Sequence, residues 1–217
     1  MHGLTTIQTI SVSILPLIFA ITVHEVAHGW VASKLGDPTA RMLGRLTLNP
    51  VKHIDPIGTL LVPGILLLLG GFIFGWAKPV PVDWRNLRNP RRDMALVAAA
   101  GPGANLAMAI GWALIAKLGL LLAPVSPWAS LPLILMGKVG IYLNLILMVL
   151  NLLPLPPLDG GRVLVGLLPP RAAASVARIE PYGFYILLAL LFFGVLGRII
   201  GPPIFALERL LYGLAGI

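Results

Sequence analysis

The chain has 217 residues, of which 58% are hydrophobic and only 11% are charged, and its mean hydropathy is +0.93. Soluble domains contain about 45–50% apolar and about 25% charged residues, and a chain of this size cannot bury so much apolar surface with so few charges to cover it. A soluble enzyme, a disordered chain and a nucleic-acid-binding protein are therefore excluded. The net charge of +8 is typical of basic membrane loops that face an anionic inner leaflet.

The first apolar stretch, residues 7–35, is expected to be a retained membrane span. Residues 1–9 contain no Lys or Arg, so the basic start of a signal peptide is missing. Four further stretches reach or approach the roughly 20 residues that a membrane helix needs; they are residues 57–75, 94–123, 131–153 and 182–199. We expect a Gly-Pro-Pro break at residues 201–203 to end the last of them, with a shorter segment after it.

These stretches predict an all-α polytopic membrane protein with about five to six transmembrane helices. No long polar linker separates them, so residues 1–217 are expected to form a single membrane-embedded domain. The lipid bilayer is therefore an expected partner, and nucleic acid is not.

The second stretch is unusual because basic loops, residues 34–56 and 76–93, flank it on both sides. A simple crossing would place one of these loops outside, against the positive-inside tendency. Gly70-Gly71 interrupts the helical pattern, and the Pro-rich residues 72–82 favour extended backbone. We therefore predict that residues 72–82 turn back as a membrane-embedded extended or hairpin segment beside the first span. The alternative is a straight helix through about Trp76 and an outer loop.

The first span contains His24-Glu25-Val26-Ala27-His28, an H-E-x-x-H pattern. Residues four apart lie on one helix face, so both imidazoles can reach one metal ion. Glu25 can contact a metal-bound water and take its proton without being a ligand. Because polar residues inside a membrane span are costly, they indicate a functional site.

A third ligand is needed, and the chain has no Cys and only 8 acidic residues. Asp159 is distinct from the others because it follows a Pro-rich stretch after the fourth apolar segment and precedes Gly160 and Gly161. The prolines forbid a regular helix there, and the glycines permit close backbone approach. The residues alone leave an alternative, in which Asp159 caps a short helix at about residues 160–168.

Two motifs in this order resemble the site-2 protease family of intramembrane zinc metalloproteases. H-E-x-x-H at residues 24–28 is followed by N-x-x-P-x-P-x-L-D-G at residues 151–160. Between them, Gly101-Pro-Gly-Ala-Asn105 resembles the family's G-P-x-x-N motif. The resemblance is to the compact prokaryotic branch, without a PDZ or other accessory domain, and so implies a multi-pass protein of a prokaryotic cell membrane.

The resemblance also implies the roles of the site residues. It gives one zinc ion per chain with three ligands, His24, His28 and Asp159. Glu25 becomes the catalytic carboxylate that activates a zinc-bound water. Asn151, and with a weaker motif Asn105, are candidates for holding the substrate or the oxyanion. The expected reaction is cleavage of a membrane-protein substrate within or next to its transmembrane segment.

Other interpretations of the same residues stay open at this point. The two His and the Glu could line a cation path in a transporter, although the other spans offer few polar residues for one. Glu25 could activate water without a metal, or the protein could be a non-catalytic scaffold. His53 and Asp55 predict a polar turn before a helix, with a gating element as the alternative. Asn144 is equally compatible with a helix–helix hydrogen bond and with a site residue.

Overall fold

The computed structural model describes residues 5–62, 64–65 and 75–217. It is helical, without a β-strand in these ranges. The longer helices are α1 (Thr6–Leu35), α4 (Pro90–Leu122), α5 (Pro127–Asn151), α6 (Asp159–Leu167), α7 (Pro170–Ala177), α8 (Glu180–Phe192) and α9 (Val195–Ala215). The short ones are α2 (Thr39–Met42), the 3₁₀ helices η1 (Pro50–His53) and η3 (Trp84–Asn86), and a π-helical turn, η2 (Pro56–Leu61).

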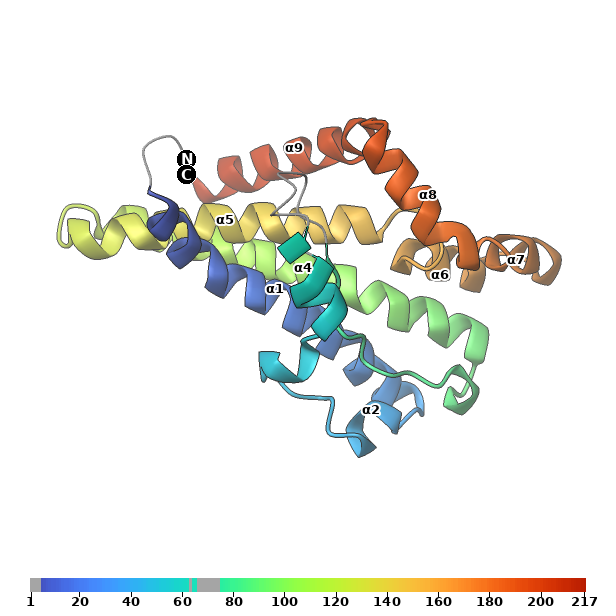
Figure 1. The fold of residues 1–217 in the computed structure, drawn as a ribbon. Coiled ribbons are helices and arrows are strands. Elements are labelled where there is room, and N and C mark those ends of the chain that lie inside the picture. Colours follow the sequence, from blue (N-terminus) through green and yellow to red (C-terminus); the bar gives the residue numbers. More distant parts are fainter. Residues whose placement is uncertain (1–4, 63, 66–74) are drawn as a thin grey trace.

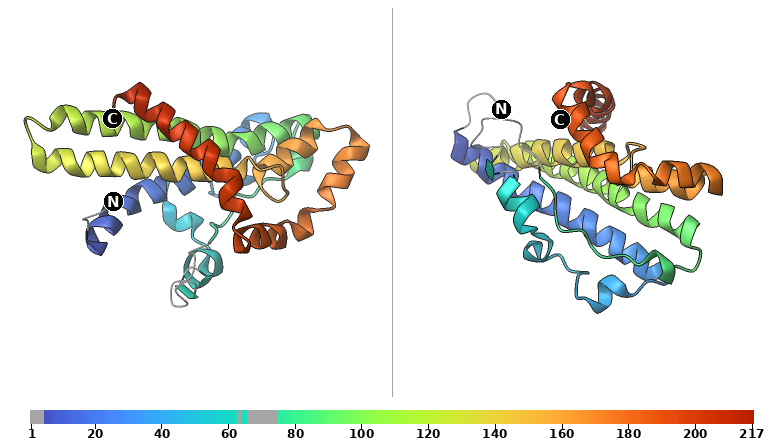
Figure 2. Two further views of the ribbon diagram at one scale, coloured as in Figure 1. Left: turned by 90° about the horizontal axis from the view of Figure 1, so that it is seen from above. Right: turned by 45° about the vertical axis from the view of Figure 1, so that its right-hand side comes forward.

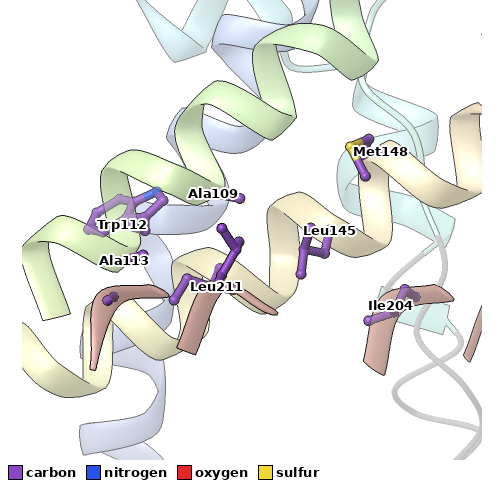
Figure 3. Close-up of a cluster of buried hydrophobic side chains, with 9 residues drawn as sticks. Ala109, Trp112, Ala113, Leu145, Met148, Ile204 and Leu211 are labelled. Carbon is purple, nitrogen blue, oxygen red and sulfur yellow. The ribbon is translucent and has the colours of Figure 1, made fainter. Parts of the chain in front are cut away.

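Helices α4 and α5 lie side by side along most of their length, and α1 crosses the pair (Figures 1 and 2). Small residues let the two long helices approach closely: a Cβ atom added to Gly137 of α5 would lie 2.5 Å from the Cβ of Ala116 on α4. The apolar core continues onto α9. Figure 3 shows Trp112 of α4, Leu145 of α5 and Leu211 of α9 converging in it.

Three of the described helices, α1, α4 and α5, are long and apolar enough to cross a membrane. The pair α7 and α8, bent by 58°, would make a fourth span if it is counted as one. The all-α polytopic membrane architecture is therefore confirmed. The expected second span lies partly outside the described residues, and the total of five to six spans stays a prediction.

The end of the last expected span was predicted at the wrong place. The helix breaks at Gly194, whose φ of 69° is a left-handed conformation that favours glycine, and α9 then runs unbroken through Pro202 and Pro203. Ile204 and Leu211 bury the inner face of α9 against α4 and α5. This packing outweighs the hydrogen bonds that the two prolines remove from the helix interior.

Candidate metal centre

Helices α1 and α6 bring His24, His28 and Asp159 together, as the two motifs predict. The Nε2 atoms of the two imidazoles lie 3.1 Å apart, and each lies 3.3 Å from Oδ2 of Asp159. His24 and Asp159 are 7% and 6% exposed. The three potential ligand atoms thus converge on one point inside the protein.

A hydrogen bond at Nδ1 of each ring determines the tautomer of both imidazoles. Nδ1 of His24 lies 2.6 Å from Oδ1 of Asn105, and Nδ1 of His28 lies 2.7 Å from the carbonyl oxygen of Val97. Both partners are oxygens that only accept, so each Nδ1 must carry the proton. In the neutral rings each Nε2 therefore presents a lone pair to the other and to Asp159.

The orientation of Asn105 follows from a second amide behind it. Its Nδ2 donates to the carbonyl oxygen of Ala20 (3.1 Å) and to Oδ1 of Asn144 (2.9 Å). Asn144 in turn donates its own amide to the carbonyl oxygen of Gly140 (2.8 Å). These donors fix both amides, so Oδ1 of Asn105 faces His24. The arrangement matches the outer hydrogen bond that metal-binding histidines normally donate.

Three lone-pair atoms that face one another fit a cation. Oδ2 of Asp159 is buried and accepts no hydrogen bond from the described part of the chain. A buried carboxylate oxygen without a donor is costly unless a positive charge lies beside it. Two imidazole nitrogens and one carboxylate oxygen are a set of three protein ligands that zinc accepts in catalytic sites, where a water takes the fourth position. The residues present therefore fit a zinc ion.

The loop before α6 determines where the Asp159 carboxylate lies. Leu158 is the N-cap of α6, and Asp159 is the first residue of the helix. Among the described residues no side chain caps this end of α6, and Asp159 lies inside the helix, so the alternative in which Asp159 serves only as a helix cap is wrong. A Cβ added to Gly160 or Gly161 would collide with the backbone of residues 152–156, so the loop can fold tightly only with glycine at these positions.

The third motif has a steric role beside the two candidate histidine ligands. A Cβ added to Gly101 of α4 would lie 2.5 Å from Cε1 of His24 and from Nε2 of His28. Only glycine lets α4 pass this close to both rings. The G-P-x-x-N motif therefore supplies both the room for the imidazoles, at Gly101, and the hydrogen-bond partner of His24, at Asn105.

Residues 75–83 form no helix and lie beside α1 (Figure 1). Trp76 donates its backbone N–H to the carbonyl oxygen of Gly58, and Lys78 donates to that of His53. Val80 donates to Oε2 of Glu25 at 2.8 Å. Donation by every second residue toward one side is the pattern of extended backbone.

The extended segment predicted at 72–82 is thus confirmed for residues 75–82, and the straight helix through Trp76 is wrong. Residues 72–74 lie outside the described residues. Arg45 also holds this segment, because its guanidinium donates to the carbonyl oxygens of Lys78 and Pro79. Sequence reasoning did not anticipate that the segment would contact Glu25 itself.

A cavity of about 570 Å³ opens beside His24, one of the three candidate metal ligands. His24, Glu25 and Asn151 line it, together with His53 and the segment from Gly75 to Ala77. Asn151 donates its amide to the carbonyl oxygen of Leu147 one turn back. The fully buried Asn105 is not among the described residues that line this cavity, because it lies behind His24.

The remaining polar residues of the motif regions have structural partners. Asp55 accepts from the backbone N–H groups of Ile57 and Gly58, which confirms the predicted polar turn. His53 donates from Nε2 to the carbonyl oxygen of Thr47. Asn144 makes the helix–helix hydrogen bond to Asn105, and through it also belongs to the surroundings of His24.

The fold and the site together define a helical membrane protein with a buried His–His–Asp group that could hold a metal ion. The model of peptidase family M50 matches residues 121–194, which contain Asn151 and Asp159. No solved structure matches the chain.

Several bacterial proteins are similar to the chain over most of its length. "Putative zinc metalloprotease YwhC" of Bacillus subtilis is 45% identical over 178 residues, 82% of this chain and 78% of that protein. "Putative zinc metalloprotease Rip2" of Mycolicibacterium smegmatis is 33% identical over 187 residues, 83% of this chain and 66% of the relative. "Putative zinc metalloprotease Rip2" of Mycobacterium tuberculosis (strain H37Rv) is 32% identical over 173 residues, 79% of this chain and 62% of that protein.

The chain belongs to peptidase family M50, the site-2 protease family, and is a zinc metalloprotease. It spans less than two thirds of the length of the mycobacterial relatives.

Proposed function

We propose that this protein hydrolyses peptide bonds within or next to the transmembrane segments of other membrane proteins in a bacterial cell membrane. The observation that carries the proposal is the position of the metal centre. Two of the three proposed ligands, His24 and His28, lie on α1, which is long and apolar enough to span a membrane, and His24 lines the same cavity as Glu25.

In this proposal His24, His28 and Asp159 hold the zinc ion. When bound, zinc lowers the pKa of a water to about 7 and polarises the scissile carbonyl. Glu25 takes the proton of that water on its carboxylate and later passes it to the leaving amine. Val80 donates to one oxygen of this carboxylate, which holds Glu25 in position at the cavity wall.

The substrate has to be extended at the cleavage site, because a helix hides its carbonyls in its own hydrogen bonds. In residues 75–80, the backbone donors of Trp76, Lys78 and Val80 point toward η1, η2 and α1. The backbone N–H and C=O groups of Ala77 therefore point to the opposite edge of the segment, where a substrate strand could pair. Pro79 and Pro81 have no N–H to donate at that edge, and the carbonyl oxygen of Pro79 already accepts from Arg45.

The two asparagines of the motifs take different roles in the proposal. Asn151 lines the cavity and keeps the role of contacting the substrate or the oxyanion. Asn105 is buried behind His24, and its amide is used in hydrogen bonds to His24, Ala20 and Asn144. We therefore propose that Asn105 orients the His24 imidazole in place of contacting the substrate.

The test compares the membrane proteomes of cells that carry either the wild-type protein or Glu25→Gln. Fragments cut in or beside a transmembrane segment, and present only with the wild type, are the expected result. Zinc content is measured on both purified proteins as the control for an intact site. Identical fragment sets, with equal zinc and equal expression, would contradict the proposed activity.

A further inference from the structure

A second, apolar pocket of about 410 Å³ adjoins the metal cavity beneath α8. The residues that line it are Trp76, Pro157, Leu158, Gly183, Phe184 and Leu187. Trp76 and Leu158 also line the cavity of about 570 Å³ beside His24, here called the metal cavity, so each of these two residues forms a wall that both spaces share. The volume lies within the range of about 300–1,000 Å³ that small-ligand pockets occupy.

Leu158 brings the pocket next to the reacting centre, because it directly precedes the proposed zinc ligand Asp159. Its backbone is fixed on both sides: its N–H donates to the carbonyl oxygen of Leu155 at 2.9 Å, and its own carbonyl oxygen accepts from Arg162 at 3.2 Å. A substrate side chain that enters the pocket past Leu158 would therefore start from a position next to the proposed metal centre.

The other shared wall, the indole of Trp76, lies between Gly58 and α8. Its backbone is held by Gly58 and by the Thr59 hydroxyl, which donates to the Trp76 carbonyl oxygen at 2.8 Å. A Cβ added to Gly58 would collide with the indole, so the ring lies directly on the glycine backbone. On its other side the indole meets the Phe184 ring edge to face, with the ring centres 6.1 Å apart.

Close packing on the loop that precedes Asp159 positions α8. A Cβ added to Gly183 would collide with the carbonyl oxygen of Pro156, so glycine is required for this approach. Figure 2 shows α8 beside the loop between α5 and α6. Leu187, one turn after Gly183, is 7% exposed and lines the apolar pocket without lining the metal cavity.

We propose that this pocket receives a large apolar side chain of the substrate, from a residue adjoining the scissile bond, and that Trp76 and Leu187 set its size limit. The inference rests on the proposed proteolytic function. Its basis is continuity: the pocket shares two walls with the cavity of the metal centre, one of them the residue before a proposed ligand. Transmembrane segments supply the leucine and phenylalanine side chains that such a pocket would accept.

The test uses three metal-chelating hydroxamates that differ only in the side chain beside the hydroxamate: methyl, isobutyl or benzyl. Their dissociation constants are measured by calorimetry on the purified, zinc-loaded protein in detergent. Burial of the larger apolar groups should tighten binding by about tenfold or more relative to methyl in the wild type. Binding is the readout, so no substrate has to be known.

Leu187→Trp fills the pocket and should abolish the preference for isobutyl and benzyl while leaving the affinity of the methyl compound unchanged. Leu188→Trp is the matched control, because Leu188 is 37% exposed on the same helix, and it should keep the preference. If Leu187→Trp does not fold, Leu187→Phe should reduce the preference in the same direction.

Equal affinity of the three compounds for the wild type would overturn the pocket as a side-chain site while leaving the metal centre intact. Equal loss of preference in Leu187→Trp and Leu188→Trp would also overturn it. If no hydroxamate binds the zinc-loaded protein, the proposed function itself fails, and the inference that rests on it fails too.

Discussion

Two buried carboxylates of this chain, Asp37 and Asp159, have opposite surroundings. Asp37 is fully buried after the end of α1 and accepts four hydrogen bonds: from the N–H and hydroxyl of Thr39, the N–H of Asp83 and the amide of Asn86. Oδ2 of Asp159 accepts none from the described residues, and faces two imidazole nitrogens.

The difference separates a structural carboxylate, Asp37, from the proposed metal ligand, Asp159. The donors around Asp37 satisfy its charge, so this residue has no need of a cation. Asp37 also ties the end of α1 to η3, and so fixes the far end of the extended segment that contacts Glu25. Asp159 is also buried, but its Oδ2 has no hydrogen-bond donor among the described residues. A bound metal ion would offset the cost of burying this charge.

The largest expected effect comes from breaking the metal centre at Asp159. Asp159→Ala should lose the zinc ion, because two imidazoles alone leave the site without its charged ligand. It should also lose the thermal stabilisation that zinc gives to the wild type, so a chelator should lower the melting temperature of the wild type only. Zinc content by mass spectrometry and melting with and without chelator measure both effects. Full zinc occupancy in Asp159→Ala would show that Asp159 is not a ligand.

The next largest effect is expected at Glu25. Glu25→Gln should keep zinc and fold, since Glu25 is not a proposed ligand, yet lower the cleavage rate by about 10²–10⁴-fold, because an amide cannot take the proton. Turnover of a membrane-reconstituted substrate found in the proteome comparison gives the rate. Near-wild-type turnover would mean that another group activates the water.

A smaller effect on zinc affinity is expected when the hydrogen bond between His24 and Asn105 is removed. Asn105→Leu removes the acceptor of the His24 Nδ1 proton and should weaken zinc binding by about 10–100-fold. Asn144→Leu should weaken it less, because Asn144 acts only by orienting Asn105. Asn151→Leu is the control and should leave zinc affinity unchanged. Competition against a chromophoric chelator measures all three, and equal affinities throughout would contradict the positioning role.

The Asp37 side of the comparison should show lost stability with zinc retained. Asp37→Asn replaces one carboxylate oxygen with an NH₂ group, which would face the N–H and O–H donors of Thr39, Asp83 and Asn86. The substitution should lower the free energy of unfolding by about 1–3 kcal/mol. Unfolding in mixed detergent micelles measures the change, with zinc content as the control. Loss of zinc from the folded variant would show that the two carboxylates are not separate in function.

The smallest expected effect is a pH dependence at Asp37. Burial by itself would raise the pKa of this carboxyl, but the hydrogen bonds from Thr39, Asn86 and Asp83 outweigh it and hold the pKa below its usual value. Its contribution to stability is therefore present above the unfolded pKa of about 3.9, and is lost as the pH falls through the lower folded pKa. Acid unfolding curves of the wild type and Asp37→Asn should converge at low pH, and curves that stay parallel would contradict this.

The sequence alone determined the helical membrane architecture and placed His24, Glu25 and His28. Both follow from short-range rules: apolar length decides which helices can span, and a spacing of four residues puts two side chains on one helix face. It also predicted the extended segment, because Pro79 and Pro81 exclude a helix over residues close in sequence. The residues left Asp159 open between a helix cap and a ligand, and only the resemblance favoured the ligand.

Only the tertiary structure decided what these residues face. The contact of Val80 with Glu25 joins positions 55 apart in sequence, and the contact of Asn105 with His24 joins positions 81 apart. Likewise, the packing of α9 kept Pro202 and Pro203 inside a helix that local rules would end. Propensity and spacing act within a few residues, whereas burial and hydrogen-bond partners depend on which helices meet, and that is fixed by packing between elements distant in the chain.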